Sequence, residues 1–145
     1  MKKIYMATLL LMIFGCMHFL AAQSSKDFKV IVNSENKIDN ISKNRLNNIF
    51  MKKVTQWSDG DRILPVNLDA ESYVRKAFSK SIHNKDVDAV QAYWRKQIFS
   101  GSSIPPVEKM NTSQVIDYVK NNPGAIGYIS SKSKADGVKE IKVTY

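Results

Sequence analysis

The sequence predicts an α/β fold in which helices cover both faces of a small, largely parallel or mixed sheet. Short runs of β-branched and apolar residues alternate along the chain with segments of helical periodicity, which is typical of layered α/β domains. The 145 residues contain no internal repeat, low-complexity tract or linker. We therefore expect a single domain after an N-terminal signal.

The first 22 residues have the pattern of a secretory signal peptide. Lys2 and Lys3 precede an apolar run, and the small residues Ala21 and Ala22 follow this run. We expect cleavage directly after these alanines, which leaves residues 23–145 as a periplasmic domain.

Two alternatives to cleavage after Ala22 stay open. The apolar run over residues 4–20, about 17 residues long, approaches the lower limit for a membrane-spanning helix. Cys16 follows a small residue, as lipid attachment requires, but the segment after it is apolar, where a processed lipoprotein turns polar.

Composition narrows the classes of partner. The chain carries 22 Lys and Arg against 13 Asp and Glu, a net charge of +9, and loss of Lys2 and Lys3 lowers this by two to +7. A cationic exported domain attracts anions, although scattered lysines are also typical of a solvated surface. The export signal argues against a nucleic acid partner. Without Cys16 the mature chain has no thiol, and the single remaining His83, expected on the surface at a helix break, cannot form a histidine metal cluster.

The first half of the domain begins with a strand over residues 28–32, "FKVIV". Ser42 is placed to cap a helix, and Ile41 with Leu46 fits a hydrophobic staple, so we expect that helix to bury Leu46, Ile49 and Phe50. A turn, "WSDGD", leads to a second strand over residues 62–66. Asp59 and Asp61 are turn-forming residues there.

The second half is mainly helical. Ser72 is the expected cap of a helix that carries Val74, Ala77, Phe78 and Ile82. A further helix begins near Asp86, ends at Gly101 and bears apolar side chains at helical spacing: Val87, Val90, Tyr93, Trp94 and Ile98. The aromatic residues Tyr93, Trp94 and Phe99 are expected in the core rather than as a stacking platform for a ligand.

The last third returns to the sheet. Asn111 with Gln114 resembles a capping box for a helix that buries Val115, Ile116 and Val119. The segment "PGAIGYIS" then predicts a buried strand over residues 125–129, with Gly127 where another group approaches closely. A final strand alternates Ile141, Val143 and Tyr145.

Catalytic motifs are not found in the sequence. No Ser-His-Asp arrangement, Walker-type loop or metal-ligand spacing occurs, so we expect neither an enzyme nor a cofactor. Candidate ligand-binding residues lie in the loops that follow predicted strands, where α/β sheets bind ligands and helix N-termini attract anions. These candidates are Ser72, Arg75, Asn33, Asn36 and Asn67. In the alternative interpretation, Ser72 only caps its helix and Arg75 is solvated.

Four stretches carry a family resemblance: "VIVNSENKIDNISKNRLNNIF", "TQWSDGDRILPVN", "AYWRKQIFSGSSIPP" and "VKNNPGAIGYIS". In this order they resemble the periplasmic substrate-binding proteins of the phosphate ABC transporter type, most closely the short members with one lobe, over residues 28–130. The resemblance implies one lobe of a type II periplasmic-binding-protein fold. It also implies a non-catalytic domain that binds phosphate or another small oxyanion weakly, with a membrane transporter or sensor as partner. The alternative is a ligand-free interaction or sensory module of the cell envelope.

The sequence departs from the family at its phosphate loop. Full-length phosphate binders use Ser-Gly-Thr at a helix start, with an arginine and an aspartate just upstream. Ser72 matches the serine, but Tyr73 and Val74 replace the glycine and threonine. Leu68 and Ala70 stand where the arginine and aspartate are expected, so the resemblance implies weak phosphate binding.

Overall fold

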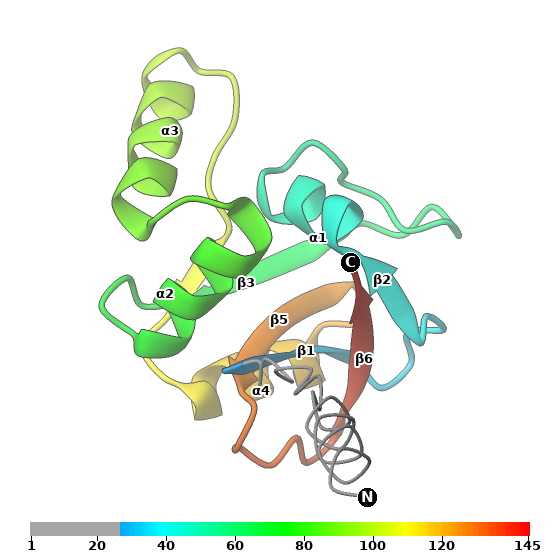
Figure 1. Ribbon diagram of the computed structural model, residues 1–145. Coiled ribbons are helices and arrows are strands. Elements are labelled where there is room, and N and C mark those ends of the chain that lie inside the picture. Colours follow the sequence, from blue (N-terminus) through cyan, green and yellow to red (C-terminus); the bar gives the residue numbers. More distant parts are fainter. Residues whose placement is uncertain (1–26) are drawn as a thin grey trace, which may run out of the picture.

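A six-stranded sheet forms the centre of the computed structural model, which describes residues 27–145 (Figure 1). Its strands, in the order β2-β6-β1-β5-β3-β4, are β1 (Phe28–Asn33), β2 (Asn40–Ser42), β3 (Leu64–Leu68), β4 (Val107–Lys109), β5 (Ala125–Ser130) and β6 (Val138–Thr144). The predicted signal peptide and Cys16 lie outside the described residues. No helix within residues 27–145 has the length and apolar character needed to cross a membrane.

Strand β1 alone runs against the direction of the other strands. It pairs antiparallel with β5 and β6, whereas β3 pairs parallel with β4 and β5, and β2 pairs parallel with β6. The prediction of a largely parallel or mixed sheet is therefore confirmed. Because of this reversal, the carboxyl ends of β1 and β3 point to opposite ends of the sheet along the strand direction.

Strand β3 begins two residues later than the sequence prediction of 62–66. Arg62 instead forms an isolated bridge with Gln56. Strand β4 was not predicted from the sequence; it pairs parallel with residues 66–68 of β3 and forms one edge of the sheet. Asn67 thus lies within a strand and not in the loop after it.

Four helices and one π-helical turn follow the predicted pattern: α1 (Lys43–Phe50), α2 (Tyr73–Phe78), η1 (Ser79–His83), α3 (Val87–Phe99) and α4 (Thr112–Asn121). The predicted caps Ser42, Ser72 and Asn111 are confirmed, because each side chain accepts a hydrogen bond from the N–H group three residues later. Asp86, near which a helix was expected to begin, caps α3 in the same way. The turn η1 continues α2 directly, so the predicted helix reaches Ile82 with a wider last turn.

Helices cover both faces of the sheet, as predicted. Helix α4 packs on one face, where a Cβ added to Gly127 would lie 2.8 Å from Val66 Cγ1 and 2.9 Å from Val115 Cγ1. The predicted close approach at Gly127 is thus confirmed. On the other face, the rings of Tyr128 and Phe78 stack with centroids 3.7 Å apart. Helices α1 and α2 close the main core on that side.

The aromatic residues of α3 differ from the prediction. Trp94 is buried and Tyr93 half-buried, in a small cluster with Met51 and Val90. Phe99 is 96% exposed and Ile98 is 55% exposed, so the prediction that Phe99 lies in the core is wrong. Figure 1 shows the reason: α3 projects away from the sheet, and its last turn extends beyond the rest of the fold.

Candidate functional site

Asn67 and Tyr128 form a buried polar pair at the carboxyl end of β3. The Tyr128 hydroxyl donates to Asn67 Oδ1 at 3.0 Å and accepts from the Leu68 N–H at 3.3 Å. Burial raises the pKa of Tyr128 to about 12, so the hydroxyl keeps its proton and acts as a donor. The side chain of Asn67 is thereby fixed at the edge of the sheet.

Arg75 lies beside this pair and is only 4% exposed. Its Nη1 donates to the Leu68 carbonyl at 2.9 Å and lies 3.7 Å from the Glu108 carboxylate on β4. A buried guanidinium needs such partners, because an uncompensated charge in the interior is costly. The structure therefore fits neither interpretation of Arg75 made from the sequence. The guanidinium is not solvated, and its pairing with Leu68 and Glu108 means that it is not a free anion-binding group.

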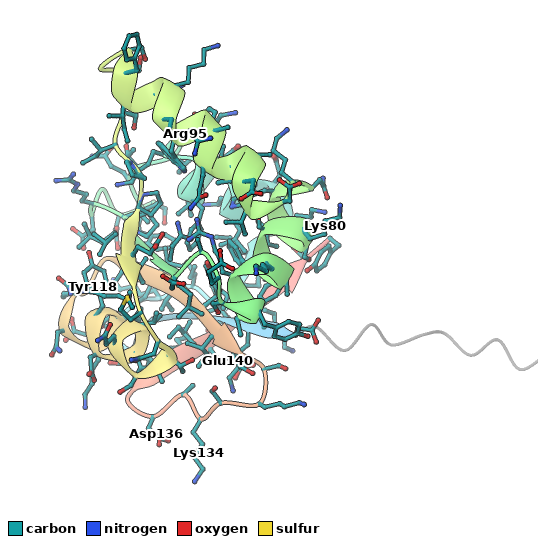
Figure 2. All side chains as sticks on the ribbon, turned by 90° about the vertical axis from the view of Figure 1, so that its left-hand side faces the viewer. Lys80, Arg95, Tyr118, Lys134, Asp136 and Glu140 are labelled. Atoms are coloured by element: carbon teal, nitrogen blue, oxygen red, sulfur yellow. The ribbon has the colours of Figure 1, made fainter. Side chains whose placement is uncertain are left out.

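A pocket of about 460 Å³ opens beside Arg75. It is lined by Asn67, Arg75, Gln91, Trp94, Arg95, Ile98, Pro105, Pro106 and Glu108. One wall comes from the sheet and α2, one from α3, and one from the segment that leads into β4. Figure 2 shows Arg95 on α3, near the yellow segment that descends from the end of this helix to β4. We call this space the α3 pocket.

Two polar groups of the α3 pocket are uncommitted. Trp94 is 5% exposed, and among the buried side-chain nitrogen and oxygen atoms of residues 27–145 only its Nε1 lacks a hydrogen-bond partner. A buried donor without a partner typically costs about 1–3 kcal/mol. Arg95 is exposed and makes no ion pair or side-chain hydrogen bond within the described part of the chain. The lining of the pocket thus includes one free cation, Arg95, and one residue, Trp94, that carries a buried and unpaired donor.

Ser72 lies outside the lining of the α3 pocket. Its hydroxyl oxygen accepts from the Arg75 N–H at 3.4 Å and caps α2, which has only six α-helical residues. The structure therefore brings Asn67 and Arg75 together at the pocket but leaves Ser72 in its capping role.

Asn33 and Asn36 lie toward the opposite end of the strands from Asn67, because β1 runs opposite to β3. Asn33 is buried, and its amide donates to the carbonyls of Val119 and Lys120 at 2.9 and 3.0 Å. Asn36 accepts from the Ile38 N–H within its own turn. Asn33 and Asn36 therefore lie apart from Asn67 and Arg75, with which the sequence prediction grouped them.

His83 is half-buried rather than on the surface as predicted. It lies in a second pocket, of about 390 Å³, formed by α1, η1 and the C-terminal residues. Its Nδ1 lies 2.8 Å from Asn47 Oδ1. Burial, and then the charge of Arg75, lower the pKa of His83 to about 4. The ring is therefore neutral at pH 7 and donates to Asn47 through Nδ1–H.

The contribution of α3 to the α3 pocket was not predicted: Gln91 and Arg95 were not singled out, and Trp94 and Ile98 were assigned only to an apolar helix face. Gln91, Trp94, Arg95 and Ile98 are spaced by three and four positions and so share one helix face. This face mixes an amide, an indole, a guanidinium and an aliphatic side chain, which is unusual for a face that packs into a core. The mixture was the available signal.

Comparisons with known proteins identify a matching family and solved structures with a similar fold. Residues 25–144 match the PBP superfamily domain. An ABC-type phosphate transport receptor from Vibrio cholerae is 21% identical, with a TM-score of 0.65 over 81% of this chain and 46% of that chain. A putative phosphate ABC transporter substrate-binding protein with bound phosphate from Clostridium perfringens is also 21% identical, with a TM-score of 0.64 over 81% and 44% of the two chains.

A third solved structure, PstS from Borrelia burgdorferi, is 20% identical, with a TM-score of 0.62 over 82% of this chain and 48% of that chain. The present chain thus spans less than half the length of each of these relatives, and the likeness concerns the fold. Because the family match covers nearly all the described residues, the chain belongs to the family described as the PBP superfamily domain.

Proposed function

We propose that this protein is an exported, non-catalytic binding domain that holds a small oxyanion weakly at the α3 pocket, in connection with phosphate ABC transport. The observation that carries the proposal is the free guanidinium of Arg95 beside a pocket that already contains the buried Arg75. The pocket has two guanidinium groups and one carboxylate. Since Glu108 already pairs with Arg75, an incoming anion meets Arg95 as an uncompensated charge.

The relatives support the choice of ligand class and partner. The solved structures include a phosphate transport receptor, and one of them holds bound phosphate. An ABC transporter in the membrane is accordingly the partner that the proposal implies. The predicted signal peptide supports export to the periplasm.

The expected affinity is low. Charge-assisted hydrogen bonds contribute about 1.5–3 kcal/mol each, and association costs at least about 4 kcal/mol. Two or three such bonds at an open pocket leave a net value of at most about 5 kcal/mol, which corresponds to a dissociation constant of about 0.2 mM or weaker.

Calorimetry of the exported chain, purified from the periplasm of an expressing bacterium, tests the proposal with phosphate and sulfate as titrants. We expect weak binding that Arg95→Ala abolishes. Lys134→Ala is the matched control, because Lys134 is an exposed cation at the opposite end of the molecule from Arg95 (Figure 2). Equal loss in both variants would indicate a general charge effect. Absence of binding in the unmodified chain would favour the ligand-free module.

A further inference from the structure

We infer that the α3 pocket takes an organic anion, whose charged group binds at Arg95 and whose apolar body lies against Ile98 and the proline wall. The inference rests on the proposed function for the charged group and adds the nature of the rest of the ligand. It predicts that an oxyanion joined to an apolar group binds better than the bare oxyanion.

The size of the pocket supports a ligand larger than an inorganic anion. Its volume of about 460 Å³ lies within the range of about 300–1,000 Å³ that is typical of small-molecule sites. A single tetrahedral oxyanion at Arg95 fills a small part of this space. The remainder adjoins Trp94, Ile98 and the two prolines, Pro105 and Pro106.

The chemistry of the lining supports an amphipathic ligand. The lining of the α3 pocket combines five polar or charged residues with four apolar or aromatic ones, Trp94, Ile98, Pro105 and Pro106, and apolar walls with convergent polar groups are typical of small-molecule sites. Ile98 is 55% exposed without a ligand, so covering it removes apolar surface from water. The Nε1–H of Trp94 is buried and unpaired without a ligand, and we expect it to turn toward an acceptor atom when a ligand binds.

A different pocket is the strongest rival site for an inorganic anion. A space of about 520 Å³ is lined by Lys52, Thr55, Gln56, Arg62, Ile63, Ser103 and Ile104, with two cations and no carboxylate. The charge of Arg62 contributes to lowering the pKa of Lys52, after burial, so the two cations are close. This second cationic pocket is the rival site that a test must separate from the α3 pocket.

The test compares phenyl phosphate with inorganic phosphate on the exported chain by calorimetry. We expect phenyl phosphate to bind at least about tenfold more tightly, because the ring adds buried apolar area. Ile98→Ala should remove most of this advantage and leave inorganic phosphate unchanged. Phe99→Ala is the matched control, since Phe99 is 96% exposed and does not line the pocket, and it should change neither affinity.

Fluorescence locates the bound ring. The sequence has two tryptophans, so Trp57→Phe leaves Trp94 as the sole emitter, and phenyl phosphate should shift or quench its emission. Phosphate binding that Arg95→Ala abolishes, without any preference for phenyl phosphate, would overturn the inference and leave the proposed function standing. Two results together would assign the ligand to the second cationic pocket: Lys52→Ala abolishes binding of phenyl phosphate, and adding phenyl phosphate to Trp57→Phe leaves the Trp94 emission unchanged. No binding of either compound would overturn both.

Discussion

The molecule has two buried apolar clusters of very different size: the sheet core, and the α3 cluster of Met51, Val90 and Trp94. The sheet core is built from strands and from helices on both faces, and within residues 27–145 it has no member from α3. Helix α3 is instead anchored by the small cluster of Met51, Val90 and Trp94. The α3 pocket lies between these two regions. One wall is therefore held by the main core, and the other by three buried side chains.

This difference predicts that the two walls of the pocket have different local stabilities. Regions with few buried apolar contacts open at lower free energy than the core around which a domain folds. Asn67 and Arg75 belong to the firmly held side, and Arg95 and Ile98 to the side that opens first. A ligand that contacts both sides would stabilise α3 against the sheet.

The largest expected effect tests the sheet core. Phe50 is 1% exposed, and its ring centroid lies 4.8 Å from that of Phe78 and 5.6 Å from that of Tyr128. Phe50→Ala should lower the free energy of unfolding by about 3–5 kcal/mol, because it leaves a cavity among packed rings. Urea denaturation measures this loss. Phe99→Ala, at an exposed position, should stay within about 0.5 kcal/mol of the unmodified protein.

A smaller loss is expected in the α3 cluster. Trp94→Ala should lower the free energy of unfolding by about 3 kcal/mol, at the low end for large aromatic residues, because the substitution also removes a buried donor without a partner. Hydrogen exchange should show that the amides of α3 lose protection before those of β1 and β5. Uniform loss of protection across all three elements would mean that the cluster and the sheet core unfold as one unit.

Sequence reasoning predicted those features of the fold that depend on neighbouring residues. Each helix cap pairs a side chain with an N–H group three positions later, so Ser42, Ser72 and Asn111 could be recognised as caps locally, and Asp86 as the start of a helix. The apolar segment that follows Pro123 and Gly124 likewise identified β5.

Features set by distant partners could not be predicted. The reversed direction of β1 depends on its pairing with β5 and β6, and no local signal fixes that direction. For this reason the sequence prediction places Asn33 and Asn67 in one site, although they lie toward opposite ends of the strands. Arg75 was expected at the surface because its partners, the Leu68 carbonyl and Glu108, meet it only when β3 and β4 pair. The exposure of Phe99 follows from the reach of α3 beyond the sheet.

The junction between the two regions should respond to pH. His83 ends η1, between α2 and α3, and its ring contacts that of Phe78 with centroids 5.5 Å apart. Burial and the charge of Arg75 lower the pKa of His83 from 6.5 to about 4 in the folded chain. The unfolded chain therefore binds more protons between these values. The contribution to stability is full above about pH 6.5 and is lost as pH falls toward about 4.

After allowance for partial exposure, this pH-dependent contribution should be about 2 kcal/mol. Urea denaturation at several pH values between 4 and 7.5 measures it. His83→Gln should flatten the part of the pH profile that lies above the titration of the carboxylates. An identical slope in the variant would show that His83 titrates normally and that the junction is solvated.

The smallest expected effect on stability comes from Trp94→Phe, which separates the packing of the α3 cluster from the polar role of its indole. The substitution keeps an aromatic ring against Met51 and Val90 but reduces its volume, which costs stability. It also removes an N–H that is buried without a partner, which restores stability by a similar amount. The two changes should leave the free energy of unfolding within about 1 kcal/mol of the unmodified protein. Phenyl phosphate should nevertheless bind less tightly, because the donor for the ligand is gone. Unchanged binding in this variant would mean that the indole N–H has no part in recognition, and that Arg95 and the apolar wall act without it.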